Sequence, residues 1–91
     1  MFTLVWTPHF TRAAKKFIKS HPELKKKIAG ILRDLEKDPF QPHLEYHKLA
    51  GKYKGIQAVS ITDDYRIIMT VVITPKEIQL LDIGSHDEVY R

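Results

Sequence analysis

Residues 65–73, YRIIMTVVI, restrict the fold of this chain more than any other stretch. The odd-numbered positions of the run are all apolar: Tyr65, Ile67, Met69, Val71 and Ile73. An apolar side chain at every second position predicts a strand with one buried face, because successive side chains point to opposite faces of a sheet. The chain must therefore supply a layer that covers the face of Tyr65, while Arg66 points away from that layer.

Two amphipathic helices near the N-terminus are predicted to form the covering layer. Thr7 and Pro8 make a helix start, with threonine as N-cap and proline at the first helical position. Pro22 is predicted to open a second helix, which ends at Asp38 and Pro39. Each helix has one apolar stripe with helical spacing: Phe10, Ala13, Ala14, Phe17 and Ile18 in the first, and Leu24, Ile28, Ile31, Leu32 and Leu35 in the second. The short SHPE link joins the two helices into an αα-hairpin.

Short β-rich runs account for most of the remaining chain. Strands are predicted at residues 2–6, 56–61, 65–73 and 78–83, with a Gly-Ser turn after the last of them. Residues 39–55 contain two prolines and two glycines and predict a long loop with at most a short strand. The predicted fold is α+β in a single domain, residues 1–91, with both helices on one face of an antiparallel sheet and the other face open.

Composition restricts the cellular compartment and the classes of partner that we expect for this chain. The chain has no cysteine, no apolar run of membrane-spanning length and no signal-peptide pattern, so we expect a soluble cytoplasmic protein. Residues 1–37 hold nine Lys/Arg against three Asp/Glu, a charge of +6, whereas residues 38–91 hold six against eight, a charge of −2. This asymmetry indicates a nucleic-acid or acidic protein partner, or else a solvated lysine-rich face.

Four features in a fixed order resemble the RelE/ParE superfamily of bacterial toxins from type II toxin–antitoxin systems. They are the basic helical hairpin, HKLAGKYKG at residues 47–55, YRII at residues 65–68 and GSHDEVYR at residues 84–91. The YafQ-like and RelE-like messenger RNA interferases are closest in pattern. The resemblance implies a RelE-like fold and an endoribonuclease that needs no metal or other cofactor. It further implies three partners: messenger RNA, the ribosome and a cognate antitoxin.

The resemblance also implies a set of site residues. The catalytic residues would be His47, Arg66, His86 and Tyr90, and substrate binding would involve Asp64, Tyr65, Lys48, Lys52 and Lys54. The chain departs from its relatives at Ser60, where YafQ-like toxins have histidine. It also departs around Gln57 and Val59, where RelE-like toxins have strand lysines. The three loop lysines are the nearest substitutes.

These residue types suit RNA cleavage by the ribose 2′-hydroxyl. One group must remove the proton of that hydroxyl, another must protonate the departing 5′-oxygen, and a cation should stabilise the phosphate. Imidazole, with an unperturbed pKa of about 6.5, serves either proton role, so the order of His47 and His86 stays open. Arg66 would grip the phosphate, Tyr90 would order the substrate, and Tyr65 would stack or pack.

Each residue also has an ordinary structural interpretation. His86 fits a polar tail, Arg66 an ion pair with Asp63 or Asp64, and Tyr90 an aromatic latch on the core. We expect no metal site, because neither His43 with His47 nor His86 with Asp87 and Glu88 has tight ligand spacing. A DNA-reading helix-turn-helix is disfavoured, because the apolar stripe of the second helix is needed for the core.

Two other functions stay open on the same fold. One is a non-enzymatic inhibitor of DNA gyrase, like the ParE branch of the superfamily. The other is an attenuated toxin that only binds its antitoxin, which the Ser60 departure keeps open. All three functions predict an acidic, partly extended antitoxin that wraps the hairpin and the sheet, and none predicts a membrane or a small-molecule cofactor.

Overall fold

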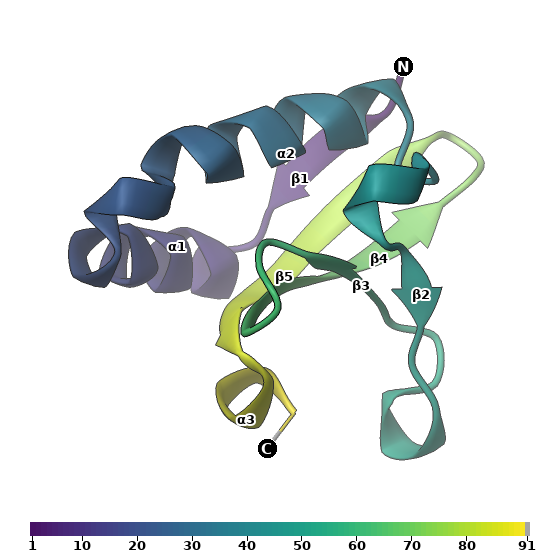
Figure 1. The fold of residues 1–91 in the computed structure, drawn as a ribbon. Helices are drawn as coiled ribbons and strands as arrows, with labels where there is room; N and C mark the ends of the chain where they lie inside the picture. Colours follow the sequence, from purple (N-terminus) through teal and green to yellow (C-terminus); the bar gives the residue numbers. More distant parts are fainter. Residues whose placement is uncertain (91) are drawn as a thin grey trace.

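A five-stranded sheet and two helices form the layers of this computed structural model, which describes residues 1–90. The strands are β1 (Thr3–Trp6), β2 (His47–Lys48), β3 (Gln57–Ser60), β4 (Tyr65–Val72) and β5 (Glu77–Ser85), in the spatial order β1-β5-β4-β3-β2. The helices α1 (Pro8–Ser20) and α2 (Lys25–Lys37) cover one face of the sheet (Figure 1). The predicted α+β fold, with a helical hairpin on one face of one sheet, is confirmed.

β1 departs from the antiparallel arrangement. It pairs in parallel with β5, with Thr3 opposite Glu77 and Trp6 opposite Leu80. The β2–β3, β3–β4 and β4–β5 pairs are antiparallel, as predicted. Residues 2–6 carry no pattern that separates parallel from antiparallel pairing, because the direction depends on which distant strand becomes the neighbour.

The start of α1 is fixed to the sheet. The Thr7 hydroxyl accepts a hydrogen bond from the Phe10 N–H (3.2 Å) and donates one to the Leu80 carbonyl (2.7 Å). Thr7 is therefore both the predicted N-cap and a link to β5. The second helix starts later than predicted, because residues 22–24 form a separate 3-10 turn, η1 (Pro22–Leu24), before α2.

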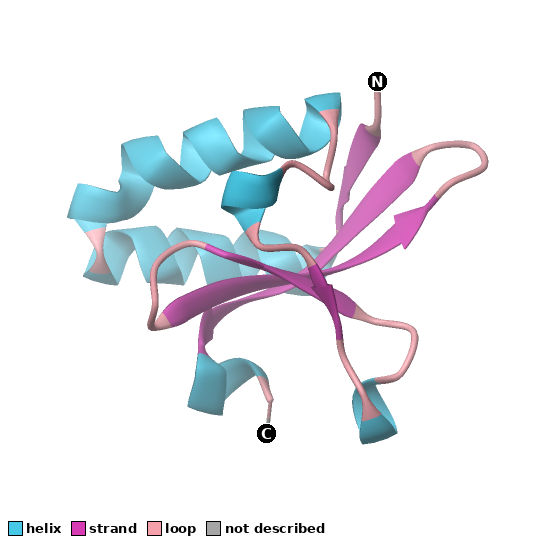
Figure 2. Cartoon of the chain, turned by 45° about the vertical axis from the view of Figure 1, so that its right-hand side comes forward, coloured by secondary structure: helices cyan, strands magenta, loops and turns pink. Residues whose placement is uncertain are grey.

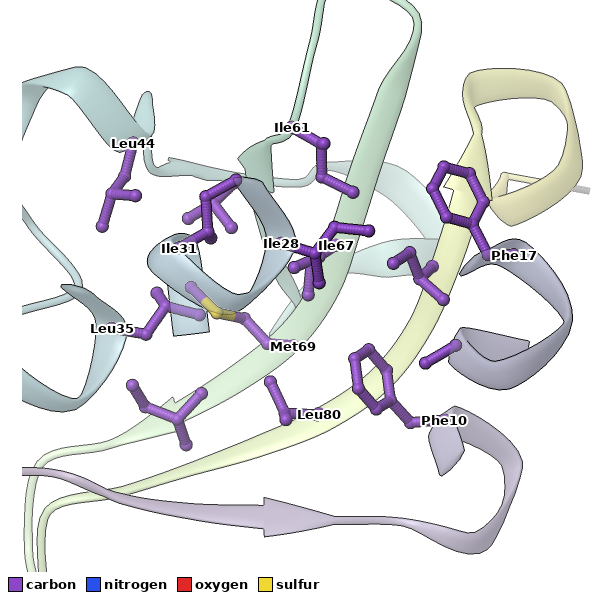
Figure 3. Close-up of a cluster of buried hydrophobic side chains, with 14 residues drawn as sticks. Phe10, Phe17, Ile28, Ile31, Leu35, Leu44, Ile61, Ile67, Met69 and Leu80 are labelled. Carbon is purple, nitrogen blue, oxygen red and sulfur yellow. The ribbon is translucent and has the colours of Figure 1, made fainter. Parts of the chain in front are cut away.

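The hydrophobic core lies between the hairpin and the sheet. Figure 3 shows side chains from α1, α2 and the strands in one cluster, among them Phe10, Phe17, Ile28, Ile31, Leu35, Ile67, Met69 and Leu80. The predicted core face of β4 holds for Ile67 and Met69, both fully buried, and for Tyr65 and Val71, which pack at the edge of the cluster. It fails for Ile73, which is 58% exposed because β4 ends at Val72.

The other face of the sheet is partly covered instead of open. Within residues 39–55 the chain forms η2 (Pro42–Leu44), β2 and a 3-10 turn, η3 (Gly51–Tyr53). Figures 1 and 2 show η3 and the C-terminal helix α3 (His86–Val89) on the side of the sheet opposite α1 and α2. Gly51 and Gly55 have φ angles of 65° and 89°, so the left-handed backbone around η3 favours glycine at both positions.

The predicted Gly-Ser turn after the last strand was wrong. β5 continues through these residues, with Gly84 opposite Arg66 and Ser85 opposite Tyr65 in β4. The pairing with β4 shifts by one residue, since Ile68 lies opposite Asp82 whereas Met69 lies opposite Leu80. α3 therefore begins directly at the end of the strand.

No helix among residues 1–90 is long and apolar enough to cross a membrane.

Candidate active site

A cleft of about 320 Å³ is lined by residues of β4, η3 and α3. Figure 2 shows η3 and α3 on the side of the sheet opposite α1 and α2. The lining residues of the cleft come from β2, η3, β4, α3 and the loops beside them: His47, Leu49, Ala50, Tyr53, Arg66, His86 and Tyr90. All four residues predicted to be catalytic are in this set. The YRII strand, the HKLAGKYKG loop and the terminal segment meet at this cleft.

His47 is oriented by the backbone just before it. Its Nδ1 lies 2.9 Å from the carbonyl oxygen of Glu45, a residue in the left-handed conformation (φ 53°). Because a carbonyl oxygen only accepts hydrogen bonds, Nδ1 carries the proton in this contact. The Nε2 atom of the neutral ring is then unprotonated, which is the state that a general base requires.

Arg66 is held by the turn between β3 and β4. Its Nη1 donates to the carbonyl oxygens of Thr62 (2.8 Å), Asp63 (3.1 Å) and Tyr65 (3.1 Å). The contact with Asp63 therefore uses the backbone, not the carboxylate of the ion pair considered from the sequence. These three hydrogen bonds all use Nη1, and the guanidinium carries further donors on Nε and Nη2 that can bind an anion.

His86 and Tyr90 lie one turn apart at the start and just beyond the end of α3. The Tyr90 N–H donates to the His86 carbonyl (3.1 Å), and the two rings lie 4.3 Å apart in an edge-to-face arrangement. The His86 side chain is 70% exposed, and its Nδ1 lies 3.7 Å from an Asp87 carboxylate oxygen. An exposed imidazole at the rim of a cleft can exchange protons with both a substrate and water.

Tyr53 was not predicted to be a site residue. It comes from η3, and its ring lies 5.7 Å from that of Tyr90. Burial raises the pKa of Tyr90, and the neighbouring Tyr53 adds to this, whereas the positive charge of Arg66 opposes it. Tyr90 is thus a neutral phenol at physiological pH. The only sequence signal for Tyr53 was an aromatic residue six positions after His47 in a loop rich in lysine.

The residues predicted to bind substrate lie outside the cleft lining. Tyr65 is on the opposite face of β4 from Arg66, with its ring 5.0 Å from Phe17 and 4.8 Å from His21, so it packs against the hairpin. Asp64 is exposed in the turn before β4, where its N–H donates to the Thr62 hydroxyl. The three lysines are exposed beside the cleft: Lys48, Lys52 and Lys54. The Lys52 ammonium lies 5.2 Å from the Tyr53 ring centroid.

The positions that depart from the superfamily pattern fall beside the cleft and in the core. Ser60 lies directly opposite Arg66 across the β3–β4 pair. Val59 is fully buried in the core, where a lysine would be an unpaired charge. The Gln57 side chain accepts a hydrogen bond from the Val71 N–H (2.8 Å).

The first candidate metal-ligand pair weighed from the sequence, His43 and His47, does not converge. His43 Nε2 lies 2.8 Å from an Asp34 carboxylate oxygen, away from the cleft that His47 lines. No group of three or more His, Asp or Glu side chains able to hold a metal ion occurs among those described. The Glu88 side chain, part of the second candidate group, lies outside the described residues.

The match to a family model decides to which protein family this chain belongs. The model described as "Bacterial toxin of type II toxin-antitoxin system, YafQ" matches residues 2–91. The chain belongs to the YafQ toxin family. The predicted resemblance is confirmed, and so is the prediction of a type II toxin. Curated protein sequences give no significant match.

Solved structures with the same fold cover nearly the whole of this YafQ-family chain. The YoeB/ParE toxin from Agrobacterium tumefaciens is 20% identical, with a TM-score of 0.78, over 93% of this chain and 99% of that one. A copper-bound mutant toxin from Helicobacter pylori is 26% identical, with a TM-score of 0.73, over 98% and 99%. The DinJ-YafQ complex from Escherichia coli gives 17% identity and a TM-score of 0.73, over 100% of both chains.

Proposed function

We propose that this YafQ-family toxin is an endoribonuclease that cleaves messenger RNA during translation. The observation that carries the proposal is the convergence of two histidines, an arginine and a tyrosine in one open cleft: His47, Arg66, His86 and Tyr90. These are the residue types that transfer two protons and stabilise one phosphate. His47 comes from β2, Arg66 from β4, and His86 and Tyr90 from the terminal segment at α3.

In the proposed reaction, His47 is the general base and His86 the general acid. Nε2 of His47 removes the proton from a ribose 2′-hydroxyl, and the oxygen attacks the adjacent phosphorus atom. The bond from phosphorus to the 2′-oxygen forms as the bond to the 5′-oxygen breaks, and His86 donates a proton to that leaving oxygen. The products are a 2′,3′-cyclic phosphate and a free 5′-hydroxyl. The hydrogen bond from His47 Nδ1 to Glu45 supports this order, since it leaves Nε2 free to accept a proton.

Arg66 and Tyr90 bind and orient the phosphate in this proposal. The remaining guanidinium donors of Arg66 contact the non-bridging oxygens, where charge grows in the transition state. Tyr90, a neutral phenol, donates a hydrogen bond or stacks on an unstacked base. Lys48, Lys52 and Lys54 attract the RNA backbone from the rim, because exposed lysines act on phosphates without direct contact.

The proposed partners are messenger RNA, the ribosome and a cognate antitoxin. Support for the antitoxin comes from the family description and from the Escherichia coli relative, whose structure is a DinJ-YafQ complex. The charge of +6 on residues 1–37, nine basic against three acidic residues, suits an acidic protein.

Primer-extension mapping of cellular messenger RNA after brief induction tests the proposed function. The wild type and a His43→Ala control are expected to give the same cuts within translated reading frames, because His43 lies outside the cleft. His86→Ala is expected to give none, while its circular dichroism spectrum stays unchanged because the side chain is exposed. Growth arrest without cuts in all three strains contradicts the proposal and favours a toxin that inhibits a protein target.

A further inference from the structure

Tyr53 has no role in the proposed reaction, although it lines the cleft beside the residues that carry the reaction. Together with Leu49 and Ala50 it forms an apolar and aromatic wall, which comes from the loop between β2 and β3. Such a wall transfers no protons and binds no phosphate. Its chemistry suits the part of an RNA strand that is flat and can stack on an aromatic ring, which is the base.

The backbone of η3 holds Tyr53 in place before RNA binds. The Tyr53 N–H donates to the Ala50 carbonyl (3.3 Å), and the Tyr53 carbonyl accepts a hydrogen bond from the Ile56 N–H (3.0 Å). The residue is half-buried, and its ring meets the Tyr90 ring at a centroid distance of 5.7 Å and an angle of 62°. Because the ring is already positioned, it loses little conformational entropy when a second flat group stacks on it.

One face of the Tyr53 ring is covered by a group that a ligand can displace. The Lys52 ammonium lies over this ring, 5.2 Å from its centroid, and Lys52 is exposed. A cation–π contact between exposed groups is weak, so a base can take the place of the ammonium on the ring. The displaced lysine stays beside the cleft, where it attracts the RNA phosphates.

The order of the strands indicates which nucleotide reaches Tyr53. His47 is on β2, Arg66 is on β4, and His86 follows β5, so the two histidines lie on opposite sides of Arg66 in the sheet order. In an in-line displacement, the attacking 2′-oxygen and the departing 5′-oxygen also lie on opposite sides of the phosphorus atom. With the phosphate on Arg66, the nucleotide that provides the 2′-hydroxyl therefore lies on the side of β2 and η3 (Figures 1 and 2).

We propose that Tyr53 stacks on the base of the nucleotide 5′ of the cut and holds that nucleotide in the cleft. The inference rests on the proposed function, including the assignment of His47 as the general base. Stacking binds an unpaired base without contacting its hydrogen-bonding groups. A base at this position is therefore required for tight binding, and its identity affects binding through the strength of stacking.

A dinucleotide tests the assignment, because its single phosphate can occupy the Arg66 site in only one register. The probe is 2′-deoxyadenosine joined through a 3′,5′-phosphate to adenosine, which lacks the attacking hydroxyl and is not cleaved. NMR titration of the purified full-length toxin measures its dissociation constant. With the wild type, we expect nuclear Overhauser effects between the Tyr53 ring protons and the 5′ adenine. Tyr53→Ala is expected to bind the probe at least about 10-fold more weakly.

Two abasic probes, each lacking one of the two adenines, distinguish stacking from a structural role of the ring. Loss of the 5′ adenine is expected to weaken wild-type binding at least about 10-fold but to change Tyr53→Ala binding little, because base and ring contribute through the same contact. Loss of the 3′ adenine is expected to weaken both proteins by the same factor. A ring that only supports α3 through Tyr90 predicts instead that Tyr53→Ala weakens the binding of all probes equally.

Two further variants provide the test if Tyr53→Ala does not fold. Tyr53→Phe retains the flat ring and is expected to bind like the wild type, whereas Tyr53→Leu has apolar bulk without a flat face and is expected to bind weakly. Phe40→Ala is the matched control, because it removes a ring that is 47% exposed and packs edge-to-face on Tyr46 (4.8 Å), outside the cleft. We expect this control to bind every probe like the wild type.

Three outcomes overturn the assignment. They are no binding of the dinucleotide to the wild type, no contact between the 5′ adenine and Tyr53, and an equal effect of the 5′ abasic change on the wild type and Tyr53→Ala. Coupling between Tyr53 and the 3′ adenine overturns it as well and indicates that the two histidines have the reverse roles. Stacking on Tyr53 in a toxin that cuts no messenger RNA leaves the assignment intact and contradicts only the proposed cleavage.

Discussion

His47 and Arg66 are both positioned by backbone carbonyl oxygens and not by charged side chains. The Glu45 carbonyl fixes His47, and three carbonyls of residues 62–65 fix Arg66. Carbonyl oxygens do not titrate, so both orientations persist over a wide pH range. The N–H groups of Arg66 that do not bind backbone carbonyls keep a fixed direction, because the guanidinium group is rigid and planar.

Replacing Arg66 tests how much of the cleavage rate depends on the planar guanidinium group. Arg66→Lys keeps the charge but cannot hold three carbonyls and a phosphate together. We expect the single-turnover cleavage rate to fall about 100- to 1000-fold, as when one transition-state donor is removed elsewhere. Arg33→Lys, an exposed change on α2, is the control and is expected to leave the rate unchanged. A rate near the wild-type value for Arg66→Lys contradicts a positioning role for the guanidinium.

Tyr46 gives a prediction about alkaline stability. Burial raises the pKa of Tyr46 above the 10.0 of an unfolded tyrosine. The folded state then holds its proton more tightly, so this group does not alter stability below pH 10.0, and the free energy of unfolding falls as the pH rises above it. Urea unfolding at about pH 8 and about pH 11 is expected to show a smaller loss for Tyr46→Phe than for the wild type. An equal loss in both proteins contradicts this origin of the loss.

At the scale of elements, local sequence patterns predicted most of the helices and strands. They failed where the extent or direction of strand pairing depends on a strand far away in the sequence. The Thr7-Pro8 start, both apolar stripes and the buried side of β4 were visible because capping and periodicity are properties of neighbouring residues. Gly84 and Ser85 have the composition of a turn, yet Arg66 and Tyr65 of β4 extend the pairing across them. The parallel pairing of β1 likewise depends on a strand more than 70 residues away.

Thr7 links the start of the first helix to β5. Thr7→Ala removes the cap of α1 and the hydrogen bond to Leu80 together, so we expect a loss of about 2 kcal/mol in the free energy of unfolding. Thr11→Ala removes an exposed hydroxyl that bonds only within the helix, and a change below about 0.5 kcal/mol is expected. Urea denaturation of both variants measures the difference, and equal losses contradict the dual role of Thr7.

At the scale of the whole molecule, the sheet separates the hydrophobic core, which stabilises the fold, from the candidate active site. The core cluster lies between the sheet and the hairpin (Figure 3). The candidate catalytic side chains line the cleft beside η3 and α3, which lie on the other side of the sheet (Figure 2). Sequence alternation predicted this division for Tyr65 and Arg66. It could not predict Tyr53, because the approach of η3 to α3 depends on the path of two irregular segments that are joined only through the sheet.

This separation predicts opposite effects for two changes. A chain that stops at Ser85 lacks His86 and Tyr90 and is expected to cleave no RNA, yet to lose only about 1 kcal/mol of stability with the Tyr53–Tyr90 contact. Leu35→Ala, at a fully buried core position, is expected to cost about 2–5 kcal/mol while the folded fraction keeps its activity. Urea unfolding and cleavage by the same samples test the pair, and active truncated protein contradicts the site.

The place of β5 between β1 and β4 affects the order of events during protein synthesis. β1 leaves the ribosome first but has no strand to pair with until residues 77–80 have followed it. His86 and Tyr90 emerge later still, after the side chains that face them across the cleft. A nascent toxin therefore cannot assemble its cleft before translation has passed Tyr90 and this segment has left the exit tunnel. If the cleft cleaves RNA as proposed, a nascent chain that ends before His86 cannot cut the message that encodes it.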